Sequence, residues 1–238
     1  MITIQTLSVF LNHYFDADRF MHEQPGIMRA SPRSVHRLGL ALDPWPGLAE
    51  WVQMEHLDAL LLHRPFKLET NTLPDELGLL GYHLPLEEKL ALGYNTRLAD
   101  ALGMTKISVL GRRAGRPLGM MGNVPPQTVA EFYKSVTDVF GGREDARTCE
   151  RNEVCQVAVV GAMTQSLMQQ AAMRGADVYI TGQFRQPARQ TVLETGLGVV
   201  VVGHRRSEEW ALRTLAHVIQ ERFSGLTVML PPRRPGEK

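Results

Sequence analysis

The last third of the chain alternates between short apolar runs and longer amphipathic segments, and this pattern limits the possible folds more than any other feature. Short apolar runs predict buried strands, whereas apolar residues at helical spacing predict helices. Strands are predicted at 154–160, 177–180, 198–202 and 226–230, and helices at 164–174, 184–195 and 207–223. Because strands that alternate with helices form largely parallel sheets with helices on their faces, the pattern indicates an α/β fold.

The earlier part of the chain begins with a helix and then adds strands of the same kind. Leu7, Leu11 and Phe15 lie on one helical face, whereas the polar segment 16–35 predicts a loop. Asn95 is predicted to be the N-cap of a helix. The remaining elements are strands at 38–42, 57–62, 77–82 and 107–110, helices at 48–56, 86–92, 96–102 and 127–140, a hairpin at 111–126 and a charged connector at 141–153.

The composition is that of an ordinary globular protein. The 238 residues are 44% hydrophobic and 21% charged, with a net charge of +1, which gives no strong signal for binding nucleic acid or a membrane surface. The sequence begins without a secretory signal pattern and has no apolar run long enough to span a bilayer. We therefore expect a cytoplasmic protein.

The two cysteines, Cys149 and Cys155, are too few for a disulfide framework. No histidine lies near them, so their spacing does not match a common zinc motif either. We interpret them as an incidental pair of thiols.

Three histidines lie at the carboxyl ends of predicted strands: His63, His83 and His204. Open α/β sheets bind ligands beyond the carboxyl ends of their strands. A single histidine in such a place is usually structural, but three at equivalent strand ends favour a functional site. Thr181 and Gln183 follow another strand and are expected to line the same cleft.

The pair His204 and Glu208 forms the strongest local pattern. If the last long helix begins early, these residues lie one turn apart on one face, and Ser207 could cap the helix. Imidazole and carboxylate groups are suitable ligands for zinc, manganese or iron. The alternative is a surface pair at the start of a helix, which is a common arrangement.

The other two histidines have similar alternatives. Arg64 follows His63, and it either belongs to the site or closes the end of the sheet by pairing with a carboxylate. His83 and Glu87 surround the start of a helix, where a glutamate also balances the helix dipole without any catalytic role.

The order of these motifs resembles the GTP cyclohydrolase I type 2 family, also called the NIF-three-like family of dinuclear metal centre hexameric proteins. The resemblance covers residues 38 to 230, whereas the residues before 36 match poorly. The matching segments are Leu40-Ala41-Leu42-Asp43, Leu61-Leu62-His63-Arg64-Pro65, His83 through Glu87 with Gly93, Asn95, Leu98 and Ala99, Gly175-Ala176-Asp177-Val178-Tyr179-Ile180-Thr181-Gly182, and Gly203-His204 with Glu208.

The resemblance implies a three-layer NIF-three-like fold with two α/β lobes and the site in the cleft between them. We expect one domain over 1–238, with lobes at about 1–112 and 113–238 and no inserted domain. It also implies a hexameric ring. Apolar pairs at Met120–Met121 and Pro231–Pro232, which we expect near the surface, fit such an assembly loosely.

The resemblance further implies a divalent metal centre. Carried over, the ligands are His63, Glu87, His204 and Glu208, with Glu87 standing where the family has an aspartate. The second of the family's two adjacent histidines is Arg64 here, and a guanidinium cannot ligate a cation. We therefore expect one metal per chain, with Arg64 occupying the second cation position and neutralising Glu87. Zinc, iron and manganese suit these ligands alike.

Two classes of function follow from the resemblance. The first is a metal-dependent hydrolase acting on a nucleotide or other small molecule, in which a metal lowers the pKa of water and His83 or Glu87 moves protons. The alternative is an oligomeric metal-binding scaffold or regulator without turnover, which the change of a family glutamate to Gln183 favours. A third possibility is a protein without metal, in which Arg64 pairs with Glu87 and Glu208.

Overall fold

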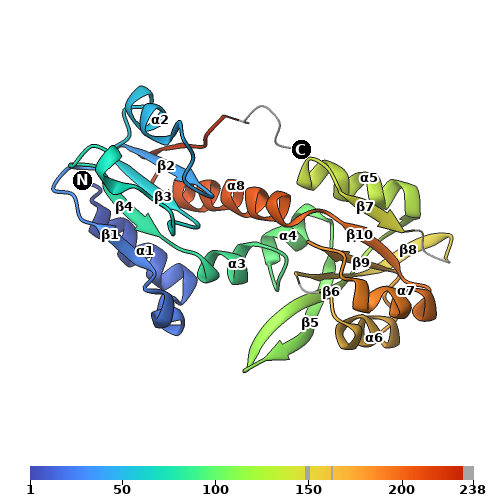
Figure 1. Ribbon diagram of the computed structural model, residues 1–238. Helices are drawn as coiled ribbons and strands as arrows, with labels where there is room; N and C mark the ends of the chain where they lie inside the picture. The colour runs from blue at the N-terminus through green and yellow to red at the C-terminus, as the bar shows by residue number, and fades with distance from the viewer. Residues whose placement is uncertain (148–150, 162, 233–238) are drawn as a thin grey trace. The chain divides into compact units, whose positions relative to one another are not determined.

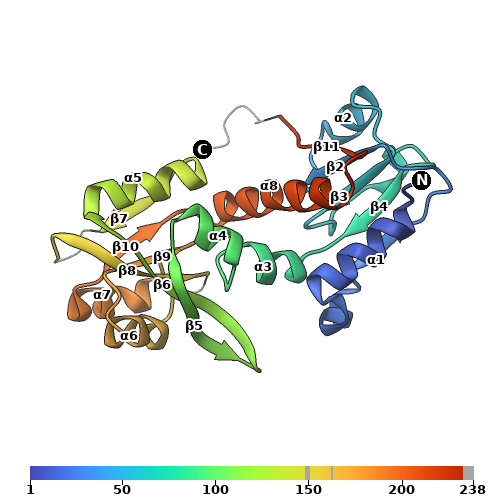
Figure 2. The same cartoon turned by 180° about the vertical axis from the view of Figure 1, so that it is seen from behind.

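The computed structural model describes residues 1–147, 151–161 and 163–232 (Figures 1 and 2). The chain divides into two compact units, one formed by Met1–Leu86 with the chain from Leu212 onward, the other by Glu87–Ala211. The last strand, β11 (Thr227–Met229), pairs in parallel with β2 (Arg37–Ala41) and so belongs to the first unit. The organisation of both units as one domain stays a prediction.

The first unit contains a five-stranded sheet in the order β1-β4-β3-β2-β11. Its strands β2, β3 (Ala59–Leu62), β4 (Gly78–Gly81) and β11 are parallel, and β1 (Gly26–Arg29) joins the edge in antiparallel. The strands predicted at 38–42, 57–62 and 77–82 are thus confirmed. The loop predicted at 16–35 is wrong, since it holds β1 and the short 3-10 helix η1 (Ala17–Glu23).

Helices cover this sheet where glycines in the strands permit close approach. Besides η1, the helical elements of this unit before residue 87 are α1 (Ile4–Phe15), α2 (Leu48–Met54), the 3-10 helix η2 (Thr70–Thr72) and the start of α3 (Leu84–Leu90). A Cβ atom on Gly39 would lie 2.9 Å from Cη2 of Trp51 in α2, and one on Gly78 would lie 2.5 Å from Cδ1 of Ile4 in α1. The glycines therefore let helices pack directly against the strands.

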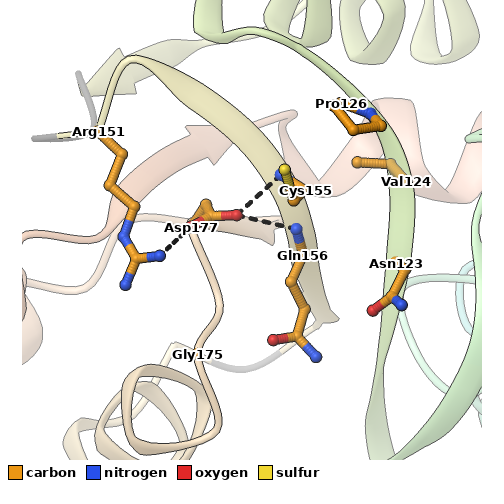
Figure 3. A pocket seen from close by; sticks show the side chains of 8 residues that line it. All are labelled: Asn123, Val124, Pro126, Arg151, Cys155, Gln156, Gly175 and Asp177. Atoms are coloured by element: carbon orange, nitrogen blue, oxygen red, sulfur yellow. Dashed lines mark hydrogen bonds and ion pairs between the residues drawn. The ribbon is translucent and has the colours of Figure 1, made fainter.

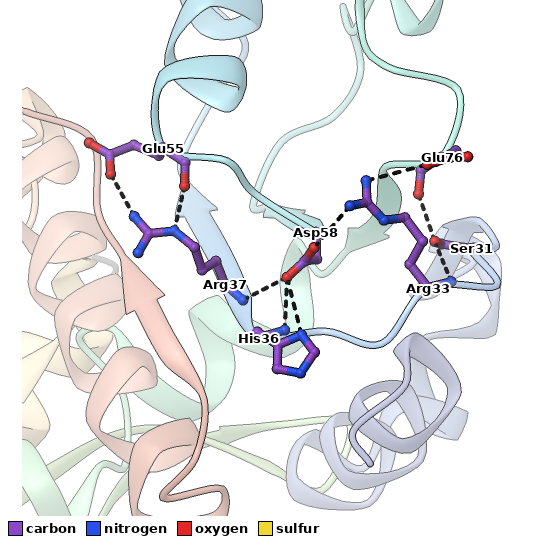
Figure 4. Close-up of polar contacts among 7 residues, drawn as sticks. All are labelled: Ser31, Arg33, His36, Arg37, Glu55, Asp58 and Glu76. Atoms are coloured by element: carbon purple, nitrogen blue, oxygen red, sulfur yellow. Dashed lines mark hydrogen bonds and ion pairs between the residues drawn. The ribbon is translucent and has the colours of Figure 1, made fainter.

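Asp58 ties together the starts of β2 and β3 in the first unit (Figure 4). Its Oδ2 accepts hydrogen bonds from the backbone N–H groups of His36 and Arg37, at 2.9 and 3.0 Å. Asp58 directly precedes β3, which ends one residue before His63. This carboxylate therefore helps to set the register that carries His63 to the end of its strand.

The second unit contains a six-stranded sheet in the order β5-β6-β8-β9-β10-β7. Its strands are β5 (Thr105–Arg113), β6 (Arg116–Thr128), β7 (Asp145–Arg147), β8 (Glu153–Val160), β9 (Val178–Thr181) and β10 (Gly198–Val201). Strands β8, β9 and β10 are parallel, and the other pairings are antiparallel. The hairpin predicted at 111–126 is confirmed as the β5–β6 pair, whereas β7 lies inside the segment predicted as a connector.

The second sheet has a hydrophobic core on each face, which gives this unit three layers (Figure 2). The helices are α4 (Thr96–Ala101), α5 (Val129–Phe140), α6 (Gln165–Met173), η3 (Gln186–Ala188), α7 (Arg189–Thr195) and α8 (His204–Arg222), of which α8 continues into the first unit. Met120 packs in one core and Met121 in the other, and both side chains are fully buried. The expectation that Met120–Met121 lies near the surface is therefore wrong, because both faces of this sheet are covered.

Asp177 has the same role in the second unit as Asp58 has in the first (Figure 3). It directly precedes β9, and its Oδ2 accepts from the N–H groups of Cys155 and Gln156 in β8, at 2.8 and 2.9 Å. Arg151 pairs with its other oxygen at 2.9 Å. The Gly-Ala-Asp motif is therefore structural: it aligns β8 with β9, and it does not supply a ligand at the carboxyl end of the sheet.

Candidate metal centre

Helix α8 begins at His204, which is the early start that the predicted pairing of His204 with Glu208 needs, so the two residues lie on its first turn. Nε2 of His204 is 3.0 Å from Oε1 of Glu208. The Glu208 side chain is 1% exposed and that of His204 is 64% exposed. The pair thus joins a buried carboxylate to an accessible imidazole.

Two residues beside this pair shape the start of α8. Ser207 does not cap the helix as predicted, because it lies inside the first turn and its Oγ donates to the carbonyl of His204 at 2.6 Å. Gly203 has a φ of +95°, and a Cβ atom there would lie 2.6 Å from Oε1 of Glu144. The turn that delivers His204 from β10 therefore requires glycine.

Glu87 completes a cluster with His204 and Glu208 in the second unit. Each of the three residues offers one ligand atom, and these atoms all lie within 4.8 Å of one another. Glu87 lies in the first turn of α3 and is half-buried. One imidazole and two carboxylates match the preferences of zinc, iron and manganese, so the donor set fits a divalent metal.

The end of β9 lies against the start of α8. A Cβ atom on Gly182 would lie 3.7 Å from Cα of His204 and 3.8 Å from Oγ of Ser207. Thr181 is buried, and its Oγ1 donates to the carbonyl of Gly161 at 3.4 Å. Gln183 is exposed. Gly182 therefore lies beside His204, and the expectation that Thr181 and Gln183 line the site stays a prediction.

His63 follows β3 in the first unit and is fully buried. Its Nδ1 lies 3.2 Å from the carbonyl oxygen of Tyr82. Because a carbonyl oxygen only accepts hydrogen bonds, Nδ1 carries the proton of the neutral ring and Nε2 keeps its lone pair. His63 therefore has the tautomer that a metal ligand at Nε2 requires.

Tyr82 is itself buried next to His63. Its hydroxyl donates to Oδ1 of Asn12 at 2.7 Å. Burial raises the pKa of Tyr82 to about 12, and the contact with Ser8 opposes this only in part. The phenol stays neutral at physiological pH and acts as a structural group.

His83 lies beside His63, with ring centroids 5.0 Å apart. Its Nδ1 is 3.1 Å from Oε1 of Glu23, and the ring of Phe66 meets it edge-on at 5.2 Å. Sequence reasoning missed Glu23, which lies in the segment that we predicted to be a loop. No local pattern distinguishes this glutamate from other surface glutamates.

Arg64 forms a two-pronged ion pair with Asp43. Its Nε donates to Oδ1 at 2.7 Å and its Nη2 to Oδ2 at 3.1 Å. This is the pairing with a carboxylate that was the alternative interpretation of Arg64. Asp43 could have been found from the sequence, because it follows β2 as His63 follows the neighbouring β3.

Cys155 is a free thiol in β8. Its pKa is raised, first by desolvation and then by the charge of Glu153, so it is not an activated nucleophile. Cys149 lies outside the described residues, and the interpretation of the two thiols as incidental stays a prediction.

The comparisons with known proteins agree on one family. A family model described as Duf34/NIF3 (NGG1p interacting factor 3) matches residues 2–232. A Pseudomonas aeruginosa protein named GTP cyclohydrolase 1 type 2 homolog is 25% identical, with 94% of each chain covered. An Allochromatium vinosum protein of the same name is also 25% identical, over 94% of this chain and 93% of its own.

Solved structures show the same fold. A structural genomics protein of unknown function, ybgI, superposes with a TM-score of 0.78 at 21% identity, over 99% of this chain and 100% of its own. The protein TTHA1606 from Thermus thermophilus gives a TM-score of 0.75 at 21% identity, with the same coverage. Within the described part of the chain, every helix is too short or too polar to cross a membrane.

Proposed function

The chain belongs to the Duf34/NIF3 family, and on that premise we propose that it binds a divalent metal ion through Glu87, His204 and Glu208, with His63 as a further ligand. The observation that carries the proposal is the cluster of three ligand atoms around the buried carboxylate of Glu208. A carboxylate with so little exposure to water needs hydrogen bonds or a cation to offset its lost hydration. A divalent cation beside Glu87 and Glu208 would supply that charge.

The assignment of His63 as a ligand rests on the sequence resemblance and on the tautomer of its ring. Its Nδ1 faces a carbonyl oxygen, which leaves Nε2 as the ligand atom. This kind of hydrogen bond to the far nitrogen is usual for metal-binding histidines. The proposal therefore assigns two imidazoles and two carboxylates to the centre.

We propose one metal per chain because Arg64 stands where the family has a second adjacent histidine. A guanidinium keeps its charge at working pH and cannot donate a lone pair to a cation. The ion pair with Asp43 also fixes Arg64 in place. Pairing of Arg64 with Glu87 or Glu208 is a further part of the proposal.

The finer proposal is a hydrolase that acts on a nucleotide, which the names of the two bacterial relatives suggest. When bound, a divalent metal lowers the pKa of water and polarises an electrophile. Glu208 would hold that ion from the buried side, and the accessible His204 would hold it on the side that faces solvent. Nε2 of His83 would accept a proton. Metal binding without turnover is the alternative that the activity assay decides.

Calorimetric titration of the metal-free protein with Zn²⁺ and Mn²⁺ tests the metal site. His204→Ala and Glu208→Gln each remove a ligand, so we expect at least about 100-fold weaker binding. His217→Ala is the matched control, because His217 is exposed on the same helix, α8. Equal affinity in all three variants would refute the site, and unchanged affinity in His63→Ala would remove His63 from it.

Turnover of GTP by the metal-loaded protein tests the hydrolase. We expect His204→Ala to abolish release of product and His217→Ala to leave it unchanged. Turnover that survives His204→Ala would count against metal catalysis. Metal binding with no turnover by the unaltered protein would favour the scaffold or regulator.

A further inference from the structure

Glu23 connects two groups at the start of α3. Its Oε1 lies 3.1 Å from Nδ1 of His83, and its Oε2 accepts a hydrogen bond from the backbone N–H of Leu84 at 3.0 Å. The side chains of Glu23 and His83 are only 21% and 23% exposed, so water competes weakly for these bonds. Both oxygens of one carboxylate thus bind adjacent residues.

This arrangement determines which nitrogen of His83 carries the proton of the neutral ring. An ionised carboxylate only accepts hydrogen bonds, so Nδ1 must be the protonated nitrogen, and Nε2 keeps its lone pair. Because Oε2 is bound to the backbone of Leu84, Glu23 cannot turn away from His83 without losing a second hydrogen bond. The carboxylate therefore fixes the position of the ring as well as its tautomer.

His63 has the same tautomer as His83, but there a backbone carbonyl oxygen determines it. There the carbonyl of Tyr82 binds Nδ1, and the ring of His63 lies 5.0 Å from that of His83. The ring of Phe66 closes another side of His83. Two neighbouring histidines thus both present an unprotonated Nε2, and a ring nitrogen of one lies within 4.8 Å of a ring nitrogen of the other.

We propose that Glu23 is a positioning residue of the metal centre, which holds His83 with Nε2 as a lone-pair donor beside His63. Glu23 lies outside the sequence motifs that carry the resemblance to the family, so none of those motifs assigns it a role. The inference rests on the proposed function, and it assigns the Nε2 lone pair of His83 to the divalent cation in place of a role in proton transfer. Carboxylates that orient metal-site histidines typically change metal affinity by about 10- to 100-fold when removed.

The first readout needs no metal. Long-range ¹H–¹⁵N correlation spectra of the metal-free protein, with the His83 signals assigned through His83→Gln, report which ring nitrogen is protonated. We expect Nδ1–H in the unaltered protein and a mixture of tautomers in Glu23→Ala. Glu76→Ala is the control, because Glu76 is an exposed carboxylate of the same unit that pairs with Arg33.

The second readout is the affinity for Zn²⁺ by calorimetry. We expect Glu23→Ala to weaken it by about 10-fold or more, and Glu76→Ala to leave it unchanged. Glutamine has nearly the same shape as glutamate, so Glu23→Gln is the variant to compare if Glu23→Ala does not fold. Its neutral amide binds Nδ1–H more weakly, and we expect the same direction of change.

The two readouts separate this inference from the proposed function. Nε2–H on His83 in the unaltered protein, or an unchanged tautomer in both Glu23 variants, would overturn the role of Glu23. A changed tautomer with unchanged Zn²⁺ affinity would also overturn it, because Glu23 would then orient a ring that the metal does not use. Absence of Zn²⁺ binding by the unaltered protein would refute the metal centre itself.

Discussion

At the scale of single residues, each histidine of the proposed centre has one ring nitrogen held by an oxygen atom of another residue. A backbone carbonyl holds His63, the carboxylate of Glu23 holds His83, and Glu208 holds Nε2 of His204. At His63 and His83 the oxygen faces Nδ1. At His204, a cation would replace the direct contact with Glu208, so we expect metal and proton to compete there.

The buried phenol of Tyr82 gives a prediction at alkaline pH. Its pKa is raised from 10 to about 12, so the unfolded chain loses the proton first and the folded protein loses stability as pH rises between these values. Tyr82→Phe removes this loss. At neutral pH the variant also lacks the hydrogen bond to Asn12, which costs about 1 kcal/mol.

Urea unfolding from neutral pH to pH 12 checks this prediction. We expect Tyr82→Phe to be less stable at neutral pH and the difference to shrink above pH 10. A difference that stays constant across this range would show that Tyr82 titrates equally in both states.

Gly203 gives a second prediction at this scale. Alanine there must adopt a φ of +95° and place a Cβ atom 2.6 Å from Oε1 of Glu144. We expect Gly203→Ala to lower the free energy of unfolding by about 1 to 3 kcal/mol. Gly225→Ala is the matched control, because a Cβ atom there has open space around it. Equal stability of the two variants in urea would contradict the account.

The candidate site could be predicted from the sequence only in part. Strand ends and helical spacing pointed to His63, His204 and Glu208, because those signals are local in the chain. The partners that set the tautomers could not be predicted. Glu23 reaches His83 across 60 residues, and such a contact exists only once the fold has brought two segments together.

At the scale of secondary structure elements, Asn95 links the end of α3 to the start of α4. As the N-cap of α4, its Oδ1 accepts from the N–H of Leu98 at 3.2 Å, which confirms the predicted cap. Its Nδ2 donates at 2.7 Å to the carbonyl of Leu90, the last residue of α3. Since α3 carries Glu87, the cap of one helix fixes the end of another that bears a proposed ligand.

We therefore expect Asn95→Ala to be strongly destabilising. It leaves the N–H of Leu98 and the carbonyl of Leu90 without this partner in a buried place, which costs about 1 to 3 kcal/mol. Asn152→Ala, at an exposed position, is the control and should change stability by less than about 0.5 kcal/mol. Thermal unfolding of both variants decides, and similar melting temperatures would contradict the role of Asn95.

The central strands were predictable because each is a buried apolar run. The edge strands β1 and β7 were not, because they have four and three residues and lack such a run. Their pairing comes from β4 and β10, which are distant in sequence. The shared role of Asp58 and Asp177 could not be predicted either, since each carboxylate accepts hydrogen bonds from the backbone of another strand.

At the scale of the whole molecule, we predict assembly into a hexamer by resemblance to the family. Burial of Met120 and Met121 removes them from this argument, but other apolar side chains are exposed in the first unit. Met28 is 45% and Phe66 is 70% exposed. A Cβ atom on Gly81 would lie 3.0 Å from Sδ of Met28 and 3.3 Å from Cγ of Pro65, so the side chains of Met28 and Pro65 lie near each other. Exposed apolar groups of this kind favour an interface.

Light scattering coupled to size exclusion tests the assembly. We expect six chains of 26.6 kDa in the particle, and dissociation in Met28→Glu. Met173→Glu is the control, since Met173 is exposed in the second unit. A monomeric unaltered protein would contradict the predicted ring.

The most direct test of the central claim is anomalous diffraction at the absorption edge of the bound metal, from crystals grown with Zn²⁺ or Mn²⁺. The account predicts one strong anomalous peak per chain, at Glu87, His204 and Glu208, with Arg64 still paired to Asp43. Two strong peaks per chain would show that Arg64 does not exclude the second ion. No peak at these residues would contradict the metal centre.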